Sequence, residues 1–156
     1  MPSVHILVAT DADYVVNDVT AALGGPDVSF SVVREGRDVS RVIAQRHVDL
    51  AVLDLQIGSM GGMAATMALR LDESAGRAPH VKVVMLLDRT ADVHLAKRSA
   101  ADAWLVKPID PLALKRTARL AMEGPTPPKP VEASVSEAAA DGAEAATEVT
   151  ETPVAG

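Results

Sequence analysis

The sequence predicts an α/β protein in which one parallel sheet is covered by helices on both faces, an architecture called doubly wound. Five short apolar segments alternate with five segments whose apolar residues recur at helical spacing. The apolar segments are continuous runs, as expected for strands that are buried on both faces. With 156 residues, 48% of them hydrophobic, the chain is long enough to bury the core of one such domain.

The first two strand and helix pairs occupy the N-terminal part of the chain. Residues 5–9 form an apolar run, and the helical periodicity that follows it stops at Gly24-Gly25-Pro26. Residues 28–32 alternate with a period of two, which is typical of a strand. The apolar spacing in residues 39–43 marks a short second helix, for which Asp38 is a candidate N-cap.

The third pair contains a glycine-rich loop between its strand and its helix. Residues 48–55 are apolar except for two aspartates, and the loop over 58–62 follows them. Met63, Met67 and Leu71 then recur at helical spacing and define the apolar face of the third helix.

The last two pairs complete the pattern. Residues 81–87 predict the fourth strand, and a helix follows over about 90–99. Residues 103–106 predict a short fifth strand. Asp110-Pro111 is a strong helix start, because an N-cap acceptor precedes proline at the first helical position, and this helix should end near Glu123.

The composition changes abruptly at the end of this pattern. Residues 124–130 contain four prolines, and large apolar side chains almost vanish after them. We therefore expect one domain over residues 1–123 and a disordered acidic tail, rich in Pro, Ala and Glu, over residues 124–156. The tail is either a solubilising extension or a segment for docking or for phosphorylation of its serines and threonines.

Charge and composition exclude several classes of function. Residues 1–123 hold 15 acidic and 14 basic side chains, a net charge of −1, whereas residues 124–156 hold 6 and 1, a net charge of −5. A near-neutral domain without a basic stripe argues against nucleic-acid binding. The absence of cysteine excludes disulfides and suits a cytoplasmic location. No apolar run is long enough for membrane insertion, and no export signal is visible.

Polar residues stand at or just after the carboxyl ends of several predicted strands, where doubly wound sheets bind their ligands. These residues are Thr10, Asp11, Asp13, Asp54, Gln56, Asp88 and Lys107. If the first and third strands are neighbours, Asp11 and Asp54 meet at one edge of the sheet. Two carboxylates are unfavourable there unless a hard cation such as Mg²⁺ joins them, so the pair predicts a metal site.

Three motifs in this arrangement resemble those of bacterial response-regulator receiver domains, in the CheY-like superfamily. Ile6-Leu7-Val8-Ala9-Thr10-Asp11 places an acid after the first strand, and Val52-Leu53-Asp54-Leu55-Gln56 places one at the end of the third. Leu105-Val106-Lys107-Pro108 places a Lys-Pro pair after the fifth. The resemblance covers residues 4–122. It implies a flavodoxin-like sheet of strand order 2-1-3-4-5 and a cis peptide bond before Pro108.

The resemblance also assigns roles to the polar residues. It implies that Asp54 is the phosphoacceptor, and that Mg²⁺ is bound by Asp11, Asp54 and the main-chain carbonyl of Gln56. Lys107 would neutralise the phosphoryl group from a second side. Structural roles stay open beside these: Asp54 as a loop-facing cap, Asp11 as a cap of the first helix, and Lys107 as a solvated lysine at a turn.

The sequence departs from the usual receiver pattern at several positions, of which Thr10, Leu87 and Asp88 bear most on the site. Receivers usually carry two acids after the first strand, but Thr10 takes the place of the first one, so magnesium binding should be weak. Leu87 and Asp88 stand where receivers usually carry a threonine or serine after the fourth strand. Asp88 would add negative charge where a phosphoryl group must sit. These changes are typical of atypical or degenerate receivers.

Two hypotheses for the function follow. The first is a stand-alone response regulator of two-component phosphorelay signalling, which receives a phosphoryl group on Asp54 from a histidine kinase or phosphotransfer protein. It would then change its affinity for a downstream protein partner, and it would be no enzyme beyond this self-catalysed transfer. The alternative is a receiver-fold interaction module, or an accessory subunit of a larger complex, that works without phosphorylation. The expected partner surface consists of Trp104, Lys115, Arg116 and Arg119.

The third hypothesis is a small α/β enzyme that acts on a soluble substrate. It has little support, because the sequence shows no nucleophile-base pair and no cofactor loop.

Overall fold

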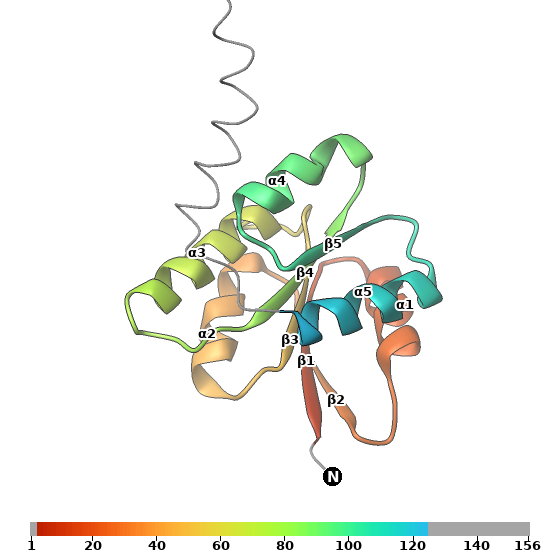
Figure 1. The fold of residues 1–156 in the computed structure, drawn as a ribbon, viewed down its shortest axis with the longest axis horizontal. Coiled ribbons are helices and arrows are strands. Elements are labelled where there is room, and N and C mark those ends of the chain that lie inside the picture. Colours follow the sequence, from red (N-terminus) through yellow and green to blue (C-terminus); the bar gives the residue numbers. More distant parts are fainter. Residues whose placement is uncertain (1–2, 125–156) are drawn as a thin grey trace, which may run out of the picture.

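Five parallel strands form the centre of the molecule in a computed structural model that describes residues 3–124. The sheet has the order β2-β1-β3-β4-β5, and its strands run side by side through the middle of Figure 1. The strands are β1 (Val4–Ala9), β2 (Val28–Val33), β3 (Leu50–Asp54), β4 (Lys82–Leu87) and β5 (Ala103–Val106). The predicted doubly wound fold and its strand order are confirmed.

Helices cover both faces of this sheet (Figure 1). On one face lie α1 (Asp13–Leu23) and α5 (Pro111–Glu123), and on the other lie α2 (Val39–Gln45), α3 (Gly62–Ser74) and α4 (Val93–Arg98). The short 3₁₀ turns η1 (Gly36–Asp38) and η2 (Thr90–Asp92) lead into α2 and α4.

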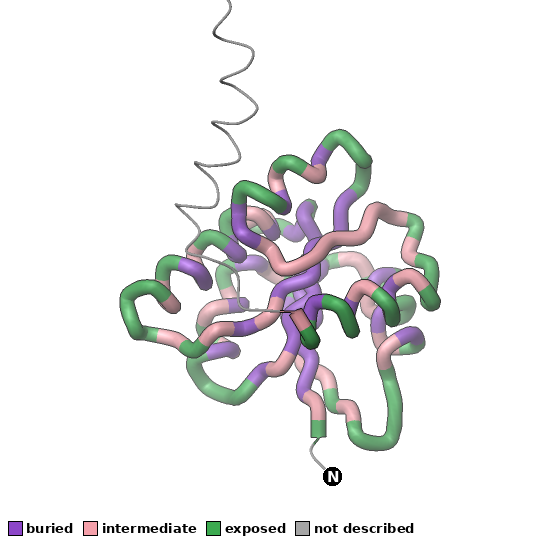
Figure 2. The backbone as a smooth tube through the Cα atoms, viewed as in Figure 1, coloured by how far each residue is buried: buried purple, intermediate pink, exposed green. Residues whose placement is uncertain are grey.

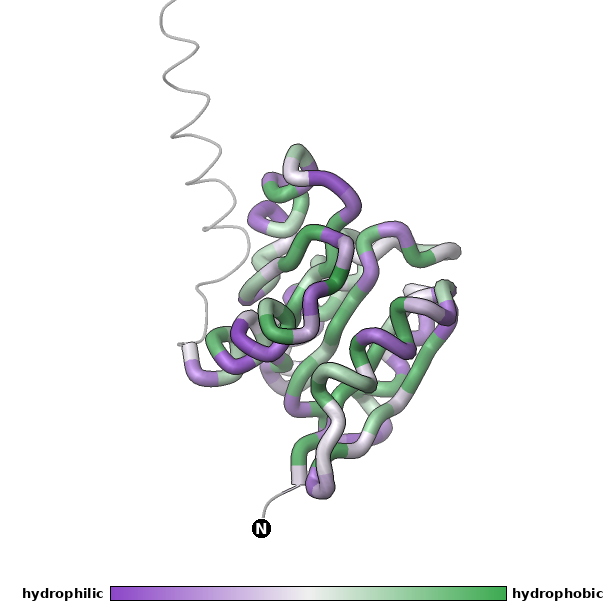
Figure 3. The backbone as a smooth tube through the Cα atoms, turned by 90° about the vertical axis from the view of Figure 1, so that its right-hand side faces the viewer, coloured by the Kyte–Doolittle hydropathy of each residue, from purple (hydrophilic) through white to green (hydrophobic). Residues whose placement is uncertain are grey.

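Alternate side chains of the strands feed two separate cores, because successive residues of a strand point to opposite faces. Ile6 and Val8 of β1 pack in the core under α1 and α5, whereas Leu7 and Ala9 pack in the core under α2 and α3. Figure 2 shows that the buried backbone is concentrated in the central strands, and Figure 3 shows these hydrophobic strands running between the helices. The sheet is thus held rigidly from both sides.

The start of α5 agrees with the predicted cap, whereas the start of α2 does not. Asp110 accepts a hydrogen bond from the backbone N–H of Ala113 at 2.7 Å, and Pro111 is the first helical residue. The expectation that Asp38 caps α2 was wrong. Asp38 ends η1 with helical backbone angles and makes no capping hydrogen bond, and its carboxylate pairs with Arg41 at 2.9 Å.

The predicted apolar face of α3 was wrong at two of its three residues, and only Met63 packs against a core cluster. Met67 is 47% exposed and Leu71 is 64% exposed. The face that packs on the sheet instead carries Ala65, Leu69 and the side chain of Arg70. The methionine periodicity misled the prediction because α3 has apolar residues on two faces, and the face that also satisfies the polar groups of Arg70 is the buried one.

Arg70 is the largest fully buried side chain of the described residues, and it joins three parts of the fold. Its guanidinium donates to the carboxylates of Glu73 at 2.7 Å and Asp102 at 2.8 Å. It also donates to the main-chain carbonyls of Val81 and Ala100, each at 2.9 Å. A buried charge requires this degree of pairing, so α3 is linked to the amino end of β4 and to the loop before β5.

Residues 125–156 lie outside the described residues, so the disordered tail and the domain boundary at residue 123 stay predictions. The last helix does end at Glu123, as predicted. Among the helices within residues 3–124, none combines the length and hydrophobicity that a bilayer crossing needs.

Candidate functional site

Asp54 is the last residue of β3 and lies at the carboxyl edge of the sheet, close to the ends of its neighbours β1 and β4. Its side chain is held among apolar strand residues, and the residue is only 2% exposed. A buried carboxylate is costly unless it is hydrogen-bonded or paired. The partners of Asp54 therefore define the site.

Three donors satisfy the Asp54 carboxylate. The hydroxyl of Thr10, at the end of β1, donates to Oδ2 at 2.8 Å. The backbone N–H of Gln56 donates to Oδ1 at 3.1 Å, and Lys107 Nζ donates to the same oxygen at 2.9 Å. Asp54 is thus an inward-facing group held by three elements, and the structure does not show it as a loop-facing cap.

Lys107 follows β5 and bridges two carboxylates. Its Nζ lies 2.9 Å from Asp54 Oδ1 and 3.1 Å from Asp88 Oδ1, and its side chain is 12% exposed. Burial by itself lowers the pKa of Lys107, but the hydrogen bonds to Asp54 and Asp88 outweigh burial and hold the pKa above its ordinary value. The ammonium therefore stays charged in the site, and the lysine is not a solvated one at a turn. The peptide bond from Lys107 to Pro108 is cis, as the resemblance implied.

Asp11 lies beside the same edge but does not cap α1. The helix begins after Ala12 without a side-chain cap, and the N–H of Ala12 is bonded to the Thr10 hydroxyl at 3.1 Å. Asp11 Oδ2 instead accepts a hydrogen bond from the backbone N–H of Gly58 at 3.2 Å. Its carboxylate is therefore directed to the loop that follows Asp54.

That loop, between β3 and α3, is held closely by glycines. A Cβ on Gly62 would lie 2.6 Å from the carbonyl oxygen of Asp54, and a Cβ on Gly36 would lie 1.6 Å from that of Met60. The N–H of Gly36 also donates to the carbonyl of Gly58 at 3.1 Å. The Gly62 contact holds the end of the loop against Asp54, and the Gly36 contacts hold the middle of the loop against η1.

The edge carries more negative than positive charge. The carboxylates of Asp54 and Asp88 share one ammonium, that of Lys107, while Asp11 adds a third carboxylate that is bonded to the N–H of Gly58. Within residues 3–124, no three His, Cys, Asp or Glu side chains are close enough to hold a metal ion by themselves. A cation here would need main-chain and water oxygens as well, which Mg²⁺ accepts readily. The oxygen donors present fit that ion.

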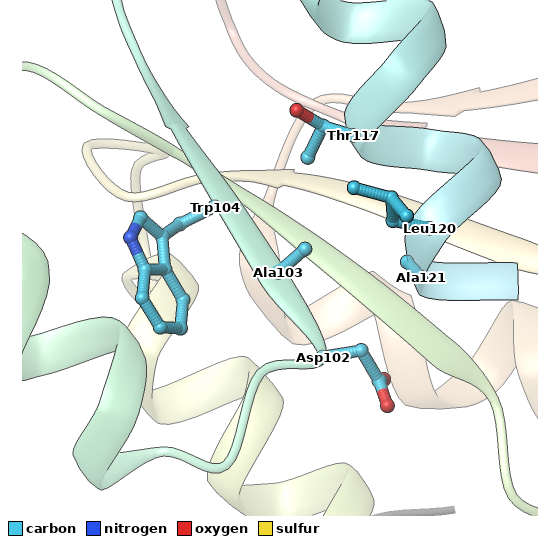
Figure 4. A pocket seen from close by; sticks show the side chains of 6 residues that line it. All are labelled: Asp102, Ala103, Trp104, Thr117, Leu120 and Ala121. Carbon is cyan, nitrogen blue, oxygen red and sulfur yellow. The ribbon is translucent and has the colours of Figure 1, made fainter. Parts of the chain in front are cut away.

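The expected partner surface divides into two parts. The ring of Trp104 on β5 is turned away from Thr117 and Leu120 of α5 (Figure 4), and Lys97 of α4 lies 5.9 Å from its centroid. In contrast, Lys115, Arg116 and Arg119 line a separate shallow hollow along α5, together with Leu112. A second hollow, of about 330 Å³, lies between β5 and α5, and Trp104 belongs to its β5 side (Figure 4).

Comparison with known proteins settles the family. The sequence pattern of the response regulator receiver domain matches residues 6–119. The chain belongs to the response regulator receiver family. One similar receiver is an uncharacterized response regulatory protein of Mycobacterium tuberculosis, 33% identical over 129 residues, which cover 79% of this chain and 94% of that protein.

Solved receiver structures share the fold of this chain. The receiver domain of the sensor histidine kinase PA1611 from Pseudomonas aeruginosa, with magnesium in its active site cleft, has a TM-score of 0.67 and 19% identity, and covers 78% of this chain and 99% of that one. A chain of the Saccharomyces cerevisiae complex between the phosphotransfer protein Ypd1 and the receiver of Ssk1 has a TM-score of 0.66 and 20% identity, over 76% and 91%.

Two contacts of this receiver site were not predicted from the sequence. Thr10 was identified as the replacement of an acid, but not as the donor that holds Asp54 Oδ2. Asp88 was identified as an extra negative charge, but not as a second partner of Lys107. Their position after the ends of β1 and β4 was the signal in the sequence. The direction of each side chain depends on the folded edge.

Proposed function

We propose that this receiver accepts a phosphoryl group on Asp54 and signals by changing its affinity for a separate protein. The observation that carries this proposal is the pairing of buried Asp54 with Lys107 at 2.9 Å, at the carboxyl edge of the sheet. A carboxylate nucleophile beside a fixed ammonium is the arrangement that phosphoryl transfer needs, because catalysis of this reaction is mostly positioning and charge neutralisation.

The proposed transfer joins an Asp54 carboxylate oxygen to phosphorus. The phosphorus–nitrogen bond of a donor phosphohistidine breaks at the same time, and the imidazole nitrogen that leaves takes up a proton. The ammonium of Lys107 moves from the carboxylate to a phosphoryl oxygen and neutralises part of its charge. The N–H of Gln56 and the hydroxyl of Thr10 keep the acceptor oriented.

We propose that Mg²⁺ is held by the carboxylates of Asp11 and Asp54 and by the main-chain carbonyl of Gln56. When bound, the ion supplies positive charge to the phosphoryl oxygens. Because Thr10 brings a neutral hydroxyl and already occupies Asp54 Oδ2, magnesium should bind weakly. The magnesium in the cleft of the similar PA1611 receiver supports this assignment.

The partners follow from the same proposal. A histidine kinase or a phosphotransfer protein would donate the phosphoryl group, and the complex of Ypd1 with the Ssk1 receiver is an example of such a partnership within this fold. The downstream partner would contact β5 and α5, where Trp104 and the basic residues Lys115, Arg116 and Arg119 line the surface.

One observation favours the alternative of a receiver that works without phosphorylation. Both oxygens of Asp54 are engaged by protein donors, and Asp88 shares the ammonium that a phosphoryl group would need. Such a module would bind its partner equally well with and without a phosphoryl mimic.

Intact-mass analysis after incubation with a small phosphodonor tests the proposal. We expect one phosphoryl addition that requires Mg²⁺ and is lost in Asp54→Asn, which keeps the size of the side chain. Asp27→Asn is the matched control, because Asp27 is exposed in the turn before β2, and it should be labelled like the wild type. Absence of labelling in the wild type, or equal labelling of Asp54→Asn, would contradict the proposal and favour the alternative.

A further inference from the structure

Asp88 differs from Asp54 in its freedom to move, although both carboxylates pair with the same ammonium. The side chain of Asp54 is 3% exposed, whereas that of Asp88 is 37% exposed. Asp54 is held by donors from Thr10 and Gln56 as well as by Lys107. Among the described residues, Lys107 is the only group that forms an ion pair with the Asp88 carboxylate, and the adjacent Arg89 interacts with it only through longer-range charge attraction. If the ammonium is drawn away, Asp88 is the group that can leave the site.

We propose that Asp88 is a positioning residue and a repulsive switch: it holds Lys107 before phosphorylation and is expelled when a phosphoryl group takes this lysine. The inference rests on the proposed phosphorylation of Asp54. A phosphoryl group brings additional negative charge and acceptor oxygens to the centre of the site. Lys107 then pairs with the phosphoryl oxygens, and Asp88 is left as a like charge without its counter-ion. Repulsion between like charges at this range drives it towards solvent.

The segment after Asp88 can carry this displacement to the protein surface. Asp88 is followed by Arg89, whose guanidinium binds the buried carboxylate of Asp92 at 2.8 Å. The N–H of Asp92 also donates to the Arg89 carbonyl at 3.0 Å. Arg89 and η2 thus form one bonded unit that leads directly into α4. A movement of Asp88 should shift α4 with it.

Trp104 reports on the position of α4. It is the single tryptophan of the chain, and Lys97 of α4 lies 5.9 Å from the centre of its ring. The ring extends from β5 away from α5 (Figure 4). A shift of α4 changes the distance between the ammonium and the ring, and therefore the tryptophan emission.

The test compares wild type, Asp88→Asn and Asp88→Glu as full chains, with Mg²⁺ and beryllofluoride as the phosphoryl mimic. Calorimetry measures binding of the mimic, tryptophan emission measures the response of α4, and intact mass after phosphodonor treatment measures phosphorylation. Magnesium alone is the blank for each protein. Asp88→Asn keeps the shape of the side chain and removes its charge, whereas Asp88→Glu keeps the charge.

We expect Asp88→Asn to bind the mimic about tenfold more tightly, because one like charge has been removed from the site. Its emission change on binding should fall severalfold below that of the wild type. Asp88→Glu should bind like the wild type and keep the emission change.

Two outcomes would overturn the inference in different ways. If wild type and Asp88→Asn bind equally and show the same emission change, Asp88 is no switch, although the proposed function stands. If neither protein binds the mimic or gains phosphoryl mass, the proposed function fails and the switch fails with it.

Discussion

Buried polar residues form side-chain hydrogen bonds between neighbouring strands, both at the candidate site and at the opposite, amino-terminal edge of the sheet. Thr10 is fully buried and turns its hydroxyl to Asp54, so one oxygen of the acceptor is bound by a neutral donor. At the amino end of β1, the ring of His5 lies between two hydroxyls of β2, with Nδ1 2.7 Å from Ser29 Oγ and Nε2 2.8 Å from Ser31 Oγ. Both residues join neighbouring strands through side chains.

The stability of the fold should depend on the protonation of His5. Burial, and after it the positive charge of Arg46, lower the pKa of His5 below its ordinary value of 6.5. At pH values between the native pKa and 6.5, the unfolded chain therefore binds more protons than the native chain. The contribution of neutral His5 to the free energy of unfolding is complete above pH 6.5, and it is lost as the pH falls through the native pKa. We expect the melting temperature of the wild type to fall between about pH 7.5 and about pH 5 more steeply than that of His5→Gln.

Melting curves of the two proteins across this range measure the effect. His94→Gln is the control, because His94 is an exposed histidine of α4, far from β1. A pH profile of His5→Gln that matches the wild type would show that His5 titrates alike in both states.

At the scale of elements, one buried side chain connects α3, β4 and β5. Arg70 pairs with Asp102, which also accepts from the N–H of Val83 at 2.7 Å. Glu73 binds His80 Nδ1 at 2.8 Å in addition to Arg70. The orientation of α3 on the sheet is therefore decided by a polar network as much as by its apolar residues, which explains why its predicted face was wrong.

Arg70→Met should destabilise the fold strongly. It leaves the carboxylates of Glu73 and Asp102 without their main partner, and breaking a buried pair typically costs about 3–5 kcal/mol. Arg77→Met is the matched control, because Arg77 pairs with Asp72 at 2.8 Å on the surface, where a pair contributes about 0–1 kcal/mol. Urea unfolding followed by circular dichroism measures both free energies. Equal losses in the two variants would contradict the role given to the Arg70 network.

For the whole molecule, the charge is uneven and the cores lie in one part of the chain. The buried residues of the two main cores fall between Ile6 and Ala121, while a net charge of −5 lies in residues 124–156. At the end of the described residues, the carbonyl of Gly124 accepts from Lys82 Nζ at 2.9 Å.

A chain that ends at Gly124 should therefore keep the stability of the full chain. We expect its melting temperature to stay within about 3 °C of the full-length value, because the truncation should change the free energy of unfolding by less than about 1 kcal/mol. A chain that ends at Arg116 is the control, since it loses the buried residues Ala118 and Ala121 of α5 and should unfold far earlier. A large drop for the chain ending at Gly124, measured by calorimetry, would show that residues 125–156 stabilise the domain.

The sequence alone determined the order of the elements, the parallel sheet and the edge at which the site lies. Hydrophobic periodicity and turn residues are local properties that the sequence shows directly. Asp54 ends β3 and Lys107 follows β5, so a parallel sheet brings both residues to its carboxyl edge whatever the direction of their side chains. It also placed the start of α5, because the capping interaction of Asp110 spans only three residues.

Only the tertiary structure decided which charged groups share a partner. The pairing of Lys107 with both Asp54 and Asp88, the hydroxyl of Thr10 on Asp54, and the burial of Arg70 each join residues far apart in the chain. Such contacts depend on side-chain direction at the junction of several elements, and the desolvation cost of each group selects among directions that the sequence leaves open. The physical reason is that periodicity is local, whereas the pairing of buried charges is a property of the assembled fold.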